Sequence, residues 1–75
     1  MSRTFTAYVE YDPETSLYIG TVPGLQGGHT QAASLDELQR NLQEVIEMIL
    51  DESESQGKHV VVEQFVGIQQ ITVER

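Results

Sequence analysis

His29 and its neighbour Thr30 are the side chains that come nearest to catalytic chemistry, in a loop rich in Pro and Gly. An imidazole can act as a general base for a hydroxyl nucleophile when a third group orients the ring. No such third group stands beside them in the sequence, and a lone loop histidine is far more often a hydrogen-bonded surface residue. We therefore expect that this chain is not an enzyme.

The numbers and positions of the cysteine and histidine residues argue against metal and cofactor chemistry. The chain has no Cys, which excludes disulfides and thiolate zinc sites and fits a reducing cytoplasm. Its two histidines, His29 and His59, lie far apart in the sequence. Because a structural metal needs several ligands close together, we expect no metal and no cofactor.

Size and charge favour protein partners. The chain has 75 residues and a formal net charge of -8, from 12 acidic and 4 basic side chains. Such a surface repels phosphate backbones and anionic lipids, so direct binding to nucleic acid or to a membrane is not expected. A basic protein partner is favoured, although plain solubility is the alternative explanation of the charge. A single core this small is marginal, so we also expect a homo-oligomer, a dimer or a tetramer.

Four segments have the composition of β-strands, and one has the pattern of a helix. Phe5, Ala7, Val9 and Tyr11 alternate with polar residues, which predicts a half-buried first strand. A turn at 12–16 leads to a returning strand, whose Leu17, Ile19 and Thr21 are expected on the core side. The predicted strands are 4–11, 17–22, 28–33 and 60–74, the last split by Gly67.

The helix is the strongest prediction in the chain. Ser34 and Glu37 have the spacing of a capping box, and an apolar stripe follows at helical intervals. Gly57 is suited to end the helix in the left-handed conformation. The stripe consists of Leu35, Leu38, Leu42, Val45, Ile46, Ile49 and Leu50. The sequence thus predicts a single α+β domain, 1–75, in the order β-β-β-α-β, with one small sheet and the helix packed on one face.

The candidate contact residues are acidic or apolar positions expected at the surface. Tyr8, Tyr18 and Glu10 are predicted to share the sheet face that the helix leaves uncovered. Leu25 is predicted to lie exposed at the tip of the Pro/Gly loop. Acidic side chains crowd the helix end, where the macrodipole is already negative. The predicted partner-binding residues are Tyr8, Glu10, Asp12, Glu14, Tyr18, Leu25, Asp51, Glu52 and Glu54.

The stretch from Tyr8 to Leu50 resembles the HicB family of small antitoxins. The resemblance rests on an aromatic strand ending in Tyr11-Asp12, the strand 18–22, the loop Pro23-Gly24-Leu25, a link containing Thr30, and the helix start Ser34-Leu35-Asp36-Glu37. Ser16 departs from the family pattern, because a Gly is usual there. If that position is left-handed, Ser costs about 1 kcal/mol.

The resemblance implies a partial ribonuclease-H-like domain that binds and masks a small basic toxin of the HicA type, which cleaves mRNA. Members of the family that bind DNA carry a further helix-turn-helix or ribbon-helix-helix segment; we expect none here, so operator binding is not expected. A residual two-metal nuclease site would have to use Glu10, Glu44 or Glu47, and Glu63. Glu44 and Glu47 are predicted to point away from the sheet, which argues against such a site. The alternative function is a stand-alone oligomeric adaptor with no toxin partner.

Overall fold

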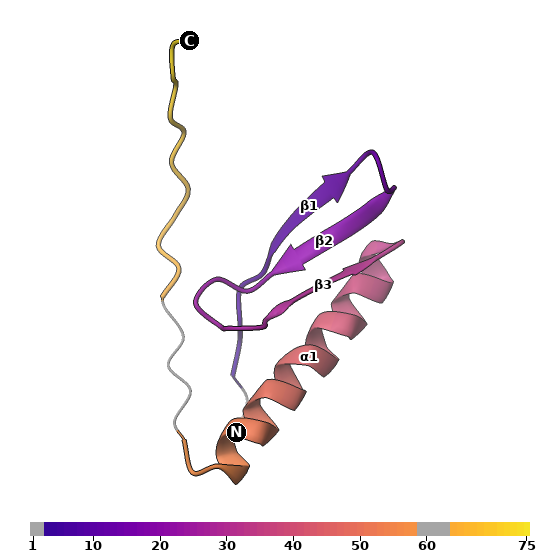
Figure 1. Ribbon diagram of the computed structural model, residues 1–75, viewed down its shortest axis with the longest axis vertical. Coiled ribbons are helices and arrows are strands. Elements are labelled where there is room, and N and C mark those ends of the chain that lie inside the picture. Colours follow the sequence, from indigo (N-terminus) through magenta and orange to yellow (C-terminus); the bar gives the residue numbers. More distant parts are fainter. Residues whose placement is uncertain (1–2, 59–63) are drawn as a thin grey trace.

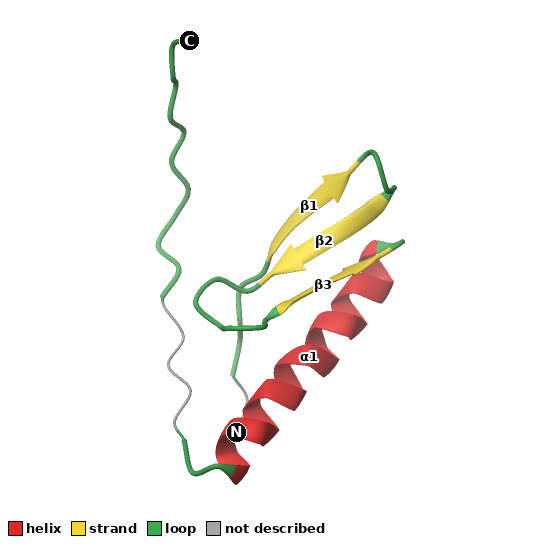
Figure 2. Ribbon diagram, in the orientation of Figure 1, coloured by secondary structure: helices red, strands yellow, loops and turns green. Residues whose placement is uncertain are grey.

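The computed structural model describes residues 3–58 and 64–75 as a small sheet, one helix and an extended C-terminal segment (Figures 1 and 2). Three antiparallel strands in the order β1-β2-β3 precede the helix, so the α+β class and the β-β-β-α order are confirmed. The helix crosses one face of the sheet, and the other face is open. The elements are β1 (Tyr8–Asp12), β2 (Leu17–Thr21), β3 (His29–Ala32) and α1 (Leu35–Ser55).

The β1–β2 hairpin is closed by a turn that requires an unusual backbone angle. Asp12 pairs with Leu17, and the amide of Ser16 donates to the carbonyl of Asp12 at 2.8 Å. The Asp12 carboxylate accepts from the amide of Glu14 at 2.9 Å, which fixes the start of the turn. Ser16 has φ 61, the only positive φ of a non-glycine residue in the described chain. Ser16 thus meets the condition under which a serine costs about 1 kcal/mol relative to the glycine usual at this position.

The hairpin register places Tyr18 on the opposite face from the one predicted. Tyr11 pairs with Tyr18, so these residues share a face, and their rings lie 5.0 Å apart. Tyr18 packs against the core under α1, whereas Tyr8 lies on the open face. The prediction that Tyr8 and Tyr18 share the uncovered face is wrong. A shift of one residue in register turns a whole strand over, and Ile19 consequently lies on the open face too.

The core lies between α1 and the part of the sheet nearest to it. Leu38 and Leu42 pack over Gly20 and Ala32, and a Cβ built at Gly20 would lie 2.8 Å from Leu42 Cδ1. Among the described elements, α1 packs against β3 and β2 and not against β1. Tyr11 was predicted to be a core residue, yet it is 52% exposed because the helix does not reach the outer strand.

Both ends of α1 follow the predicted capping pattern. Ser34 has extended backbone angles, and its Oγ accepts from the amide of Glu37 at 3.2 Å. At the other end Gly57 has φ 70, and its amide donates to the carbonyl of Glu54 at 3.0 Å. The amide of Lys58 donates to Ser53 at 2.9 Å, which completes a Schellman motif. The helix bounds could therefore be predicted from local chemistry.

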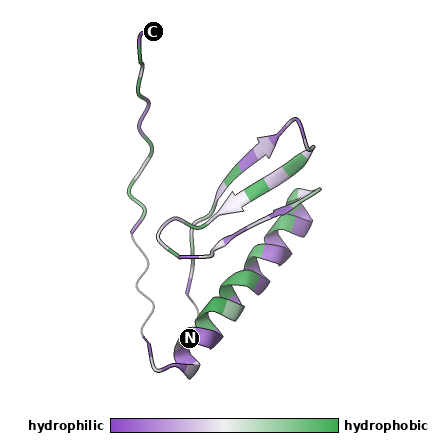
Figure 3. Ribbon diagram, viewed as in Figure 1, coloured by the Kyte–Doolittle hydropathy of each residue, from purple (hydrophilic) through white to green (hydrophobic). Residues whose placement is uncertain are grey.

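The predicted last strand is not present as a strand in the described part of its range. Residues 64–75 run as an extended segment without strand assignment, here called the C-terminal arm, and 59–63 lie outside the described residues. A strand requires a neighbouring strand to receive its hydrogen bonds, and the arm has none in the described chain. Figure 3 shows hydrophobic positions along the arm and along the side of α1 that faces the sheet.

Candidate functional site

Three predicted contact residues alternate along β1 on the open face of the sheet. Tyr8, Glu10 and Asp12 share this face, since successive strand residues point to opposite sides. Tyr8 is 43% exposed, and Glu10 is exposed as well. Both residues therefore leave side-chain surface that a partner could contact.

A second group of carboxylates lies at the hairpin end of the molecule. The chain runs up β1, down β2 and up β3, so α1 begins at the end of the sheet that carries the β1–β2 turn (Figure 1). We call this group the hairpin-end acidic surface, and it consists of Asp12, Glu14, Asp36 and Glu37. Asp36 and Glu37 were missed as contact residues, because the capping pattern explained them without reference to the turn. The up-and-down order of the strands was the signal that could have located them.

The three acidic residues of the helix end are separate from this surface. Asp51, Glu52 and Glu54 are exposed, and no basic residue lies in the last turn of α1. With a rise of about 1.5 Å per residue, Glu52 lies about 24 Å along the helix from Asp36. The structure therefore divides the predicted acidic residues into two surfaces at opposite ends of α1.

Leu25 is buried, so its predicted role as an exposed loop tip is wrong. The side chain is only 6% exposed. The loop folds back on itself, because the amide of Leu25 donates to Val22 at 3.2 Å and the amide of Gly28 donates to Leu25 at 2.9 Å. A Cβ at Gly28 would lie 3.1 Å from Leu25 Cδ2, so a side chain there would require Leu25 to shift slightly. The side chain of Leu25 therefore packs within the loop instead of standing exposed at its tip.

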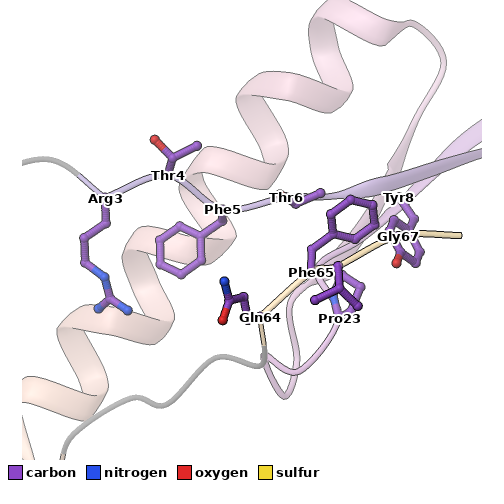
Figure 4. Close-up of a pocket in the computed structure, with 10 residues that line it drawn as sticks. Arg3, Thr4, Phe5, Thr6, Tyr8, Pro23, Gln64, Phe65 and Gly67 are labelled. Atoms are coloured by element: carbon purple, nitrogen blue, oxygen red, sulfur yellow. The ribbon is translucent and has the colours of Figure 1, made fainter.

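An open cavity of about 550 Å³ lies beside Tyr8 (Figure 4). Its walls come from the N-terminal segment, from Pro23 and from the start of the C-terminal arm. The ring of Phe65 meets Tyr8 edge to face, with centroids 5.6 Å apart. Arg3 is the only charged residue in the lining among residues 3–58 and 64–75, and its guanidinium lies 5.1 Å from the centre of the Phe5 ring. The lining mixes polar side chains, such as Thr4, Thr6 and Gln64, with aromatic rings, and it brings no carboxylate or histidine into the described part of the cavity.

His29 is exposed at the start of β3, and its amide donates to the carbonyl of Gly27 at 2.9 Å. Within residues 3–58 and 64–75, no three acidic, histidine or cysteine side chains are close enough together to hold a metal ion. Glu63, one of the carboxylates considered for a nuclease site, lies outside the described residues. In the described part of the chain, no helix is long and apolar enough to cross a bilayer.

The fold and these surfaces define a small α+β protein with a capped helix on a three-stranded sheet and carboxylates at both helix ends. The chain belongs to the UPF0150 family. It is 44% identical to a UPF0150 protein of Thermotoga maritima over 72 residues, which cover 96% of this chain and 92% of that protein.

Two further relatives extend the family across bacteria and archaea. A UPF0150 protein of Synechocystis is 39% identical over 71 residues, covering 95% of this chain and 96% of the relative. One of Archaeoglobus fulgidus is 41% identical over 69 residues, covering 92% and 93%. No family model matches the chain, and no solved structure matches it.

Proposed function

We propose that this protein is an antitoxin-like molecule of HicB type, which binds and masks a small basic ribonuclease of the HicA type in the cytoplasm. One observation carries the proposal: Tyr8 and Glu10 are exposed on the open face of β1, the strand that ends at Asp12 in the hairpin-end acidic surface. A tyrosine beside several carboxylates suits a basic protein surface, since aromatic residues anchor interfaces and opposite charges align them.

The mechanism is steric masking guided by charge. Carboxylates at the hairpin end would pair with Lys or Arg side chains that the toxin otherwise presents to RNA phosphates. Asp51, Glu52 and Glu54 lie too far away to contact the same small site, about 24 Å along the helix. They would instead contribute to the long-range field that speeds encounter of a basic partner with a chain of net charge -8.

The HicB resemblance supports this proposal over the part of the chain that forms the sheet and most of the helix. The stretch that carries the resemblance, Tyr8 to Leu50, coincides with β1, β2, β3 and most of α1. The Ser34 cap and the turn at Asp12 both lie at positions that the resemblance uses. The partial ribonuclease-H-like relation belongs to the same proposal.

The alternative is an oligomeric adaptor of the same fold without a toxin. The exposed apolar C-terminal arm favours this alternative, because it offers a surface for self-assembly that needs no second protein. The two functions differ in one requirement: only the antitoxin needs a basic partner encoded near its own gene.

Co-expression tests the proposal. The small basic reading frame beside this gene should arrest growth when expressed alone, and this chain should restore growth and co-purify with its product. Glu14→Lys should abolish both effects, because Glu14 belongs to the hairpin-end acidic surface. Glu44→Lys makes the same charge change at another exposed position, in the middle of α1, and should retain them. Absence of such a reading frame, or failure to rescue growth, would leave the adaptor as the function.

A further inference from the structure

The C-terminal arm exposes more apolar surface than is usual for a soluble monomeric protein. The exposed fractions of its large apolar side chains are 92% for Val66, 84% for Ile68, 77% for Ile71 and 69% for Val73. The Cα radius of gyration is 14.6 Å, compared with about 11 Å for a compact chain of this length. The arm therefore extends away from the core of its own molecule (Figure 1).

The arm has the chemistry of a β-strand that lacks a neighbour. It is rich in Val, Ile and Phe, which favour strands, and it carries no Pro. From Gln64 to Val73 it has no charged residue, and the charges of Glu74 and Arg75 cancel. In a chain of net charge -8, this neutral segment can approach a second copy without strong repulsion.

The outer edge of β1 is the matching acceptor. Among residues 3–58 and 64–75, β1 pairs only with β2, and this part of the chain leaves the backbone N–H and C=O groups of its other edge unpaired. Val9 and Tyr11 are 50% and 52% exposed there, because α1 does not cover this strand. The other outer strand, β3, has no large apolar side chain exposed. Exposed apolar side chains thus remain on β1 and on the arm, and the two segments can bury them against each other.

We propose that the arm of one copy adds as a fourth strand to the outer edge of β1 in a second copy, and that the two copies exchange arms. Such an exchange is symmetric, since each chain supplies one arm and one β1 edge. Within its own molecule the arm touches β1 through Phe65 and Tyr8, and from Val66 onward its large apolar side chains are exposed. The second copy gives that exposed portion a place to bury its side chains. This inference does not depend on a toxin partner.

Changing the arm tests the exchange. The full-length chain should sediment as a dimer at micromolar concentration, and Ile68→Asp combined with Ile71→Asp should give a monomer. Met48→Asp is the control, because Met48 is a 61% exposed apolar residue on α1, outside the arm. It should leave the dimer intact. Circular dichroism should show the helix of all three proteins. A monomeric natural chain, or a dimer that survives both arm substitutions, would overturn the proposal.

Crosslinking then shows which strand receives the arm. The chain has no Cys, so single cysteines can be introduced without side reactions. Chains carrying Val9→Cys, mixed with chains carrying Ile68→Cys or Ile71→Cys, should form disulfide-linked heterodimers on mild oxidation. Glu47→Cys, an exposed position on α1, should not link to the arm cysteines. Absence of heterodimer with both arm cysteines, or closure only within a chain that carries both cysteines, would contradict the exchange.

Discussion

Replacing Ser16 by glycine should stabilise this protein. Ser16 is the last residue of the β1–β2 turn, and its φ of 61 lies in the left-handed region. The turn depends on this angle, because the amide of Ser16 donates to the carbonyl of Asp12 at 2.8 Å. A side chain with a Cβ pays for the conformation through a close approach of Cβ to a carbonyl oxygen, which glycine avoids.

Two opposing effects set the size of the gain. The left-handed conformation costs a non-glycine residue about 1–2 kcal/mol. Glycine has more freedom in the unfolded chain, which costs about 0.5–1 kcal/mol on folding. The free energy of unfolding should therefore rise by about 0.5–1 kcal/mol. For a domain of this size that corresponds to an increase in Tm of about 3–6 °C.

Thermal unfolding at one fixed protein concentration measures the effect, because the Tm of an oligomer depends on concentration. Thr15→Gly is the matched control: Thr15 is exposed in the same turn and its φ is not positive. It adds the same freedom to the unfolded chain without relieving strain, so its Tm should fall. If Ser16→Gly lowers Tm as Thr15→Gly does, the turn is not strained and the reasoning is wrong.

Three further substitutions, two of them with a control, test the sheet–helix packing, the buried loop and the end of α1. Gly20→Val should lower the free energy of unfolding by about 1–3 kcal/mol in urea, because a Cβ there meets Leu42, whereas Gly67→Val, with no atom within 4 Å, should change it by less than about 0.5 kcal/mol. Leu25→Ala should cost about 2–4 kcal/mol and Leu35→Ala, at a 56% exposed position, much less; equal losses would contradict the buried loop. Gly57→Ala should lower Tm, because φ is 70 there. An unchanged Tm would contradict a stabilising role of the Schellman motif at the end of α1.

The parts of this fold that local chemistry determines could be predicted from the sequence. The Ser34 cap, the left-handed Gly57 and the strain at Ser16 each involve residues a few positions apart, so their signals lie within short stretches. The apolar stripe of α1 gave the helix, although its first member, Leu35, is exposed.

The parts that depend on register could not be predicted in the same way. Tyr18 faces the core because Asp12 pairs with Leu17, and alternation alone fits either face. Leu25 is buried because hydrogen bonds to Val22 and from Gly28 fold the loop back on itself, and composition does not reveal these contacts. Tyr11 lies on the predicted face of the sheet, but it is exposed because α1 does not pack against β1.

The C-terminal arm shows a third kind of limit. Its composition predicted a strand, and composition does not say which strand would accept the hydrogen bonds. The candidate site has the same property: Asp36 and Glu37 approach the β1–β2 turn only through the order of the strands. Residues distant in sequence become one surface through topology, which a linear pattern records poorly.

An RNA-cleavage assay tests the proposed function most directly. The purified product of the neighbouring basic reading frame is incubated with mRNA, alone or with an equimolar amount of this chain. Masking predicts that cleavage stops with the natural chain and with Glu44→Lys, and that it continues with Glu14→Lys. Undiminished cleavage in the presence of excess natural chain would contradict the account.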